Sequence, residues 1–198
     1  MEEIVDGVFH WKAPHPDIKI EVGCHFVAGS GTAIDPLIPP SEGIEWFDGR
    51  GLEKIVLSNR HHLRQAPELA ARFGVPILCH EAGLHQFEGG PKVEGFAFGD
   101  RVADDVVALE MDAICPEDTV LLIECGGGAL LFADSLIHYG EVGFVPDELI
   151  GDDPEGVKRR IRGRSAALLD QEFAHLLFAH GEPLLGTGRE ALRRVAEG

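Results

Sequence analysis

Residues 54–81, KIVLSNRHHLRQAPELAARFGVPILCHE, form the most informative stretch of the chain. The apolar run KIVLS at 54–58 predicts a buried strand, and apolar residues then recur at helical spacing over 63–73. Gly74 ends this helix, and VPILCH at 75–80 predicts a second strand. Two strands joined by a helical crossover pair in parallel, so the stretch predicts part of an α/β fold.

On both sides of this stretch the pattern favours short strands. We expect strands over residues 4–11, 19–28 and 32–36, a series of strands over 101–134, and another strand over 174–180. Glycines 126–128 predict a hairpin within the series. A weak helical stretch covers 41–50. A longer helix is expected over 153–170 with Asp153 as its N-cap, and a last helix after Thr187, where Glu190 completes a capping box. No linker divides the chain, so residues 1–198 are expected to form a single α/β domain.

The composition excludes several classes of partner. The 198 residues include 34 Asp and Glu against 17 Lys and Arg, which gives a formal net charge of −17. Such a surface repels nucleic acids and anionic membranes. No apolar run approaches the roughly 20 residues that span a bilayer, and the acidic start MEEIVDG does not resemble an export signal. Because the four cysteines form no CxxC pair, we expect reduced thiols and a cytoplasmic protein.

Polar side chains follow several of the apolar strands. Asp35 follows TAI, His61 and His62 follow KIVLS, Asp134 follows ALLFA, and His180 follows AHLLFA. Each of these, taken alone, is commonly a turn residue or a hydrogen-bonded histidine. The ends of strands are also where α/β proteins place their sites, so the group together indicates a clustered site.

These landmarks resemble the metallo-β-lactamase fold superfamily over nearly the whole chain. The resemblance rests on IDP at 34–36, the stretch 55–81, FGDRV at 98–102, LLFADSL at 130–136 and LLFAHGEP at 176–183. It implies a four-layer αββα sandwich with a metal site at one edge of two sheets. The family signature is HxHxDH after a strand, then a later histidine, an aspartate after a hairpin and a final histidine.

The metal motif of the resemblance is incomplete in this chain. The four loop positions fall on Asn59, His61, Leu63 and Arg64, and the mid-chain histidine position falls near Ile114 and Cys115. Asp134 matches the bridging aspartate, and His180 matches the last histidine. The resemblance therefore implies at most one divalent metal (zinc, iron or manganese), held by His61, Asp134 and His180, although in the family these two histidines serve different metals.

A second interpretation needs no metal. Arg64 stands at a ligand position, and its permanent positive charge suits a contact with Asp134 in place of the ion; Arg60 is a second candidate for that contact. Under this interpretation the protein is a divergent member of the family with a degenerate site. It then has a binding or structural role, with a small-molecule ligand and a possible homodimer.

Two catalytic alternatives stay open. One is a mononuclear metal-dependent hydrolase that attacks an ester, thioester, lactone or phosphoester through a metal-bound water. The other is metal-free acid–base catalysis by His61 and His62, with Asp134 as the orienting carboxylate. Asn59 is the remaining loop residue that could modify the site.

Overall fold

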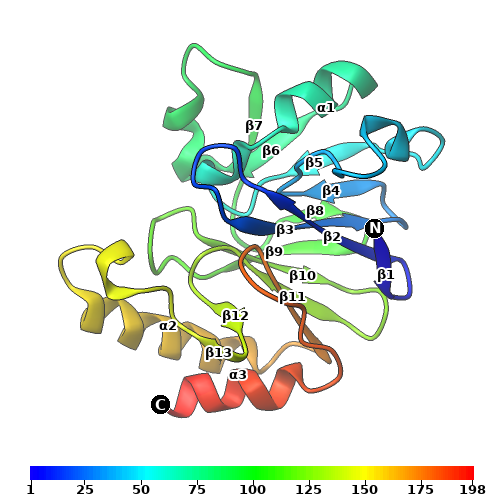
Figure 1. The fold of residues 1–198 in the computed structure, drawn as a ribbon. Helices are drawn as coiled ribbons and strands as arrows, with labels where there is room; N and C mark the ends of the chain where they lie inside the picture. Colours follow the sequence, from blue (N-terminus) through cyan, green and yellow to red (C-terminus); the bar gives the residue numbers. More distant parts are fainter.

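The computed structural model describes residues 1–198, and most of its strands form two packed sheets (Figure 1). The first sheet has seven strands in chain order, the first four antiparallel and the rest added in parallel. They are β1 (Glu2–Val5), β2 (Val8–Pro14), β3 (Glu21–Val27), β4 (Thr32–Ile34), β5 (Lys54–Val56), β6 (Ile77–His80) and β7 (Val93–Phe96). The stretch 54–81 therefore contains a parallel strand pair, as its sequence predicts.

The second sheet comes from the other half of the chain. Its order is β14 (His175–Phe178), β11 (Ala129–Phe132), β10 (Thr119–Ile123), β9 (Val106–Glu110) and β8 (Arg101–Ala103). Strands β10 and β11 form the expected hairpin around glycines 126–128, and β14 pairs in parallel with β11. A separate hairpin of β12 (Ile137–Tyr139) and β13 (Glu141–Gly143) follows β11.

Helices cover both outer faces of the paired sheets (Figure 1). Helix α1 (Ala66–Phe73) packs on the first sheet, whereas α2 (Pro154–Leu168) and α3 (Gly188–Glu197) pack on the second. Four 3₁₀ turns complete the chain: η1 (Ile44–Phe47), η2 (Arg60–Leu63), η3 (Glu81–Phe87) and η4 (Asp147–Leu149). This is the expected four-layer αββα sandwich in a single domain.

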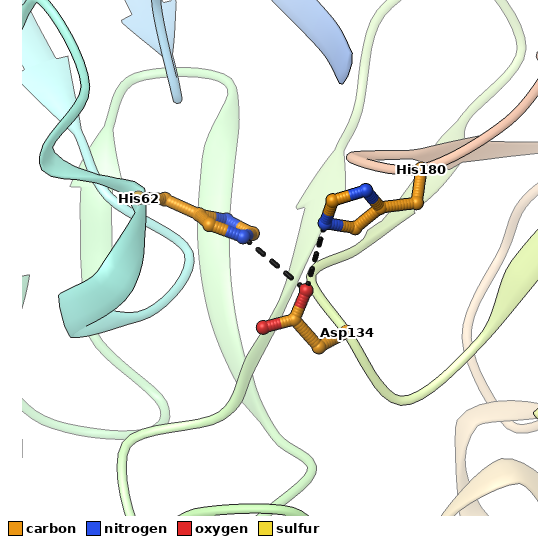
Figure 2. A group of neighbouring side chains, drawn as sticks. All are labelled: His62, Asp134 and His180. Atoms are coloured by element: carbon orange, nitrogen blue, oxygen red, sulfur yellow. Dashed lines mark ion pairs between the residues drawn. The ribbon is translucent and has the colours of Figure 1, made fainter. Parts of the chain in front are cut away.

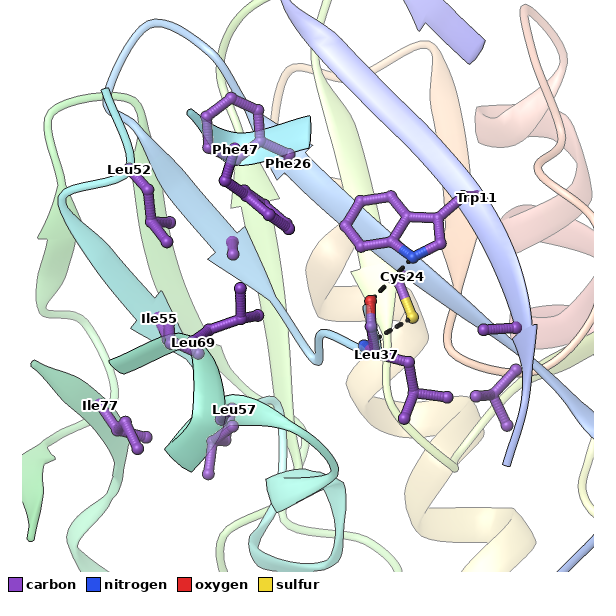
Figure 3. Close-up of a cluster of buried hydrophobic side chains, with 14 of the residues drawn as sticks. Trp11, Cys24, Phe26, Leu37, Phe47, Leu52, Ile55, Leu57, Leu69 and Ile77 are labelled. Carbon is purple, nitrogen blue, oxygen red and sulfur yellow. Dashed lines mark hydrogen bonds between the residues drawn. The ribbon is translucent and has the colours of Figure 1, made fainter. Parts of the chain in front are cut away.

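Three apolar clusters fill the spaces between the layers. The first lies between the first sheet and α1, where Trp11, Phe26, Phe47 and Leu69 pack together (Figure 3). The indole Nε1 of Trp11 donates to the carbonyl of Leu37 at 2.9 Å, so this ring also satisfies its polar atom. Another cluster packs the second sheet on α2 and α3, and the remaining one lies between the two sheets. These three layers of core hold the strand ends that carry the site in fixed positions.

Two local expectations are wrong in detail. The segment 4–11 is divided by a turn at Asp6 and Gly7, where Gly7 has a φ of 77°, so it forms the hairpin β1–β2. Thr187 precedes α3, but its side chain makes no capping hydrogen bond. The Glu190 carboxylate accepts from Arg194 at 2.7 Å and completes no capping box. Asp153 does cap α2 and accepts from the backbone of Gly156 at 2.9 Å.

None of the helices is both long and apolar enough to cross a membrane.

Candidate metal centre

The polar strand ends from the two halves of the chain meet at one edge of the sandwich. Asp35 follows β4, and the turn η2 with His62 follows β5 in the first sheet. Asp134 follows β11, and His180 follows β14 in the second sheet. The parallel pairing of β4 with β5 and of β11 with β14 brings the carboxyl ends of these strands together.

Three of these side chains converge on one point (Figure 2). Nε2 of His62 lies 3.3 Å from Oδ1 of Asp134, and Nε2 of His180 lies 3.0 Å from the same oxygen. One potential ligand atom from each residue falls within 4.8 Å of the other two. His62 is buried, whereas Asp134 and His180 are partly exposed, so the group is open on one side.

A second carboxylate fixes the ring of His62 from behind. Nδ1 of His62 lies 2.9 Å from Oδ2 of Asp35 and 3.0 Å from Oγ of Ser58. The Ser58 hydroxyl donates to Oδ2 of Asp35, and the Ser58 backbone N–H donates to Oδ1 at 2.8 Å. Because a carboxylate only accepts, Nδ1 of His62 carries a proton and Nε2 faces Asp134 and His180.

The electrostatics of the group depend on His62. Burial alone would lower the pKa of His62, but the carboxylates of Asp134 and Asp35 outweigh it and raise that pKa to about 9. Burial likewise opposes ionisation of Asp134, yet His62 and His180 hold its pKa well below the usual value. In the metal-free protein the group is therefore a buried imidazolium between two carboxylates. A metal ion at Nε2 would displace one proton from His62.

His61 faces solvent and does not join this group. Asn59 caps the turn η2, since its Oδ1 accepts from the backbone N–H of His61 at 2.8 Å. Its Nδ2 donates to Oδ2 of Asp134 at 2.5 Å, so Asn59 also positions the carboxylate of the site. The structure therefore places His62, rather than His61, beside Asp134 and His180. His62 falls at none of the ligand positions of the resemblance, so the family motif assigns it to neither metal.

Neither arginine of the loop contacts Asp134. Nη1 of Arg64 donates to the carbonyl oxygens of Gly23 at 2.7 Å and Asp35 at 2.5 Å, so its guanidinium ties the loop to β3 and the end of β4. Arg60 pairs with the buried carboxylate of Glu117. The expected substitution of an arginine for the metal is therefore not what the structure shows. The cation beside Asp134 in the metal-free protein is His62.

The donor set fits a single divalent ion. Two imidazole nitrogens and one carboxylate oxygen are the ligands of many catalytic zinc sites, which keep a fourth position open. Tetrahedral bonds of about 2.0–2.1 Å place neighbouring ligand atoms roughly 3.3 Å apart, close to the separations from Asp134 to His62 and His180. The contact from Asp35 to Nδ1 of His62 is the outer carboxylate that commonly orients a ligating histidine.

The sequence does not favour His62 over His61. Ser58 and His62 both contact the carboxylate of Asp35, but Ser58 lies outside η2, so their spacing is not that of a regular helical turn. Asp35 is visible in the sequence as a polar strand end, but its partner cannot be read from residue order. Which of two adjacent histidines points inward depends on the irregular backbone of η2, where His62 has a φ of −92° and a ψ of 25°.

Compared by sequence, the chain matches no protein-family model and none of the curated proteins. Its structure is similar to those of metallo-β-lactamases. DIM-1 metallo-β-lactamase superposes with a TM-score of 0.74 at 12% identity, covering 99% of this chain and 95% of the other. The structure of VMB-1 gives 0.70 at 12% identity with the same coverage. This chain has the metallo-β-lactamase fold.

A protein from a thermophile shares this fold. A metallo-β-lactamase family protein from Thermus thermophilus superposes with a TM-score of 0.67 at 14% identity, covering 98% of this chain and 80% of the other. Identities this low establish the fold and leave the chemistry of the site to be argued from its own residues.

Proposed function

We propose that the protein is a mononuclear metal-dependent hydrolase whose ion is held by His62, Asp134 and His180. The observation that carries the proposal is the convergence of three donor atoms within 4.8 Å at the edge where the two sheets meet. Asp35 and Asn59 support it, because they orient His62 and Asp134 from outside the donor set.

A bound divalent ion supplies a Lewis acid and lowers the pKa of water at its open position. The residues of the chain supply orientation and proton transfer. Asp35 keeps the Nδ1 proton of His62, so Nε2 stays directed at the site. Partial burial, with the charge of Arg60 beside it, lowers the pKa of His61. In this proposal His61 accepts a proton at the mouth of the site.

The substrate class is proposed from this chemistry. We assign an ester, thioester, lactone or phosphoester of a small molecule, because a single activated water with one nearby imidazole suits hydrolysis at a carbonyl or phosphoryl centre. The cytoplasmic location and the homodimer stay predictions.

The test is a substrate panel with defined metal content. Protein without a histidine tag, freed of metal and then loaded with zinc, manganese or iron(II), is assayed on p-nitrophenyl acetate, an acyl thioester, a γ-lactone and bis(p-nitrophenyl) phosphate. We expect turnover of at least one compound with one metal, lost with chelator and in Asp134→Asn, and reduced without loss of metal in His61→Ala. Arg193→Gln, on the exposed side of α3, is the control. No metal-dependent turnover on any compound would contradict the proposal.

A second candidate is a metal-free binding protein, and one observation favours it. Protonated His62 already lies between Asp35 and Asp134 and offsets one of their two negative charges without an ion. The proton with a pKa of about 9 at this ring competes with a metal. This candidate predicts that zinc and chelator leave the melting temperature unchanged. The hydrolase predicts a rise with zinc, because an ion that binds only the folded chain stabilises it.

A further inference from the structure

Three consecutive polar residues are buried where β10 begins. Glu117 and Thr119 are 0% exposed, and Asp118 is 1% exposed. None of the three belongs to the candidate metal ligands. Burying a polar group costs free energy unless the group is paired, so the partners of this segment indicate what it does.

Two residues of the segment contact the loop that carries His62. The carboxylate of Glu117 forms an ion pair with the guanidinium of Arg60 in η2, two residues before His62. The backbone N–H of Thr119 donates to the carbonyl of Ser58 at 3.1 Å. Ser58 in turn lies 3.0 Å from Nδ1 of His62, so both contacts reach the immediate neighbourhood of the ligand.

The third residue contacts the loop of Asp134. The hydroxyl of Ser135, which directly follows Asp134, donates to the carboxylate of Asp118. Within the segment, Oγ1 of Thr119 donates to the carbonyl of Glu117 at 2.8 Å, which holds the three residues in one arrangement. A single short segment therefore contacts both the loop of His62 in the first half and the loop of Asp134 in the second.

The ion pair of Glu117 and Arg60 is enclosed. The side chain of Arg60 is 21% exposed and that of Glu117 is 0% exposed. The turn η3 covers the pair, because a Cβ placed on Gly83 would lie 3.0 Å from Cγ of Glu117 and 3.2 Å from Cβ of Arg60. The attraction of a buried ion pair is largely offset by the lost hydration of both charges. Its main effect here is therefore on the position of η2.

We propose that Glu117 is a positioning residue of the metal centre. Through Arg60 it holds η2 at the distance from the second sheet at which Nε2 of His62 lies 3.3 Å from Oδ1 of Asp134. The hydrogen bond from Asn59 to Asp134 spans the same gap and acts with it. Metal ligands need a fixed separation, and the contacts outside the donor set maintain it. The proposal rests on the metal centre of the proposed function, and it does not depend on the reaction.

The first measurement is the Kd for zinc of tag-free protein. Glu117→Leu removes the acceptor for Arg60 at similar side-chain size, and we expect the Kd to rise about tenfold. Glu117→Gln keeps an oxygen that accepts from Arg60 and should recover most of the affinity. Gly83→Ala presses on the ion pair without removing a charge and should also raise the Kd.

Two controls separate positioning from stability. Ile161 is fully buried in α2, so Ile161→Ala lowers the free energy of unfolding without contacting either metal loop. Gly163 lies in the same helix, and its Cβ would meet nothing within 4 Å, so Gly163→Ala is the control for Gly83→Ala. The Kd should be unchanged in both controls, and urea unfolding without metal measures the stability of every variant.

The second measurement needs no metal. In the metal-free protein the Nε2 proton of His62 faces Asp134, and this contact slows its exchange with water. Nitrogen-edited proton NMR of the histidine rings detects the proton, and His62→Ala assigns its resonance. We expect the resonance to be lost in Glu117→Leu and kept in Ile161→Ala.

The two measurements separate this proposal from the proposed function. If the natural chain binds zinc, an unchanged Kd in Glu117→Leu, or an equal rise in Ile161→Ala, overturns the role of Glu117 and leaves the hydrolase unaffected. If the natural chain binds no zinc, the hydrolase is contradicted and the NMR resonance decides: its persistence in Glu117→Leu overturns the role. Gly83→Ala replaces Glu117→Leu in both measurements if Glu117→Leu does not fold.

Discussion

Asp118 is a buried acid whose charge is poorly accommodated. It is 1% exposed, its Oδ2 accepts from the hydroxyl of Ser135, and its Oδ1 has no partner. Burial raises the pKa of Asp118 to about 7, and the nearby Asp134 adds to the rise against the hydrogen bond from Ser135. The folded chain therefore binds this proton more tightly than the unfolded chain does.

Asp118 makes the free energy of unfolding depend on pH. Between the ordinary pKa of 3.8 and the folded value of about 7, the folded state holds more protons, so this group's contribution to the free energy of unfolding falls as pH rises. The contribution is a few kcal/mol at most, because one pKa unit corresponds to about 1.4 kcal/mol. We expect Asp118→Asn to be stabilising relative to the natural chain at pH 8 and much less so at pH 5. Urea unfolding of both proteins at pH 5 and pH 8 measures this change in stability. An equal change at the two pH values would contradict the raised pKa of Asp118.

At the same scale, part of the metal centre could be predicted from residue order. Asp134 and His180 each follow an apolar strand, and parallel strands that end at one edge bring such residues together; the structure places them 3.0 Å apart. The choice between His61 and His62 could not be made, because it depends on how Asn59 caps η2. The direction of Arg64 is likewise set by carbonyl groups of β3 and the end of β4, which have no signature in the sequence.

At the scale of elements, the hydrophobic pattern predicts most strands and helices. The polar residues that indicate helix caps are less reliable. The runs that became β5, β6, β10, β11 and β14 are mostly apolar because both of their faces are covered. The sequence does not predict the hairpin β12–β13, because its residues do not alternate regularly between apolar and polar and are partly exposed. Thr187 makes no capping hydrogen bond, and Glu190 contacts Arg194 instead of completing a capping box.

One glycine after β14 is required by close packing of elements. Gly181 has a φ of 109°, and a Cβ placed on it would collide with the backbone carbonyl of His138. We expect Gly181→Ala to lower the free energy of unfolding by about 3 kcal/mol or more, because strain and a backbone clash add together. Gly186 is the matched control, since its φ is 78° but its Cβ would meet nothing within 4 Å. Gly186→Ala should cost only about 1–2 kcal/mol.

Urea unfolding of both alanine variants tests this comparison. Because Gly181 follows His180, its variant should also weaken any metal binding, whereas the Gly186 variant should not. Equal destabilisation by the two substitutions would show that the contact with His138 does not matter.

At the scale of the molecule, the candidate metal centre joins the two halves of the chain. His62 belongs to the half that forms the first sheet, and Asp134 and His180 belong to the half that forms the second. The sheets already share a continuous apolar interface, in which Val8, Ile34, Leu121 and Leu131 are fully buried. An ion at this edge would add to a fold that is complete without it, so chelation should lower stability without unfolding the chain.

The most direct test of the account is the number of zinc ions bound, measured by competition titration against a chromogenic chelator with tag-free protein. The account predicts one equivalent for the natural chain and for His61→Ala, and none for His62→Ala or His180→Ala, with the fold of each variant checked by circular dichroism. Two equivalents, no saturable binding, or loss of the ion in His61→Ala with retention in His62→Ala would contradict it.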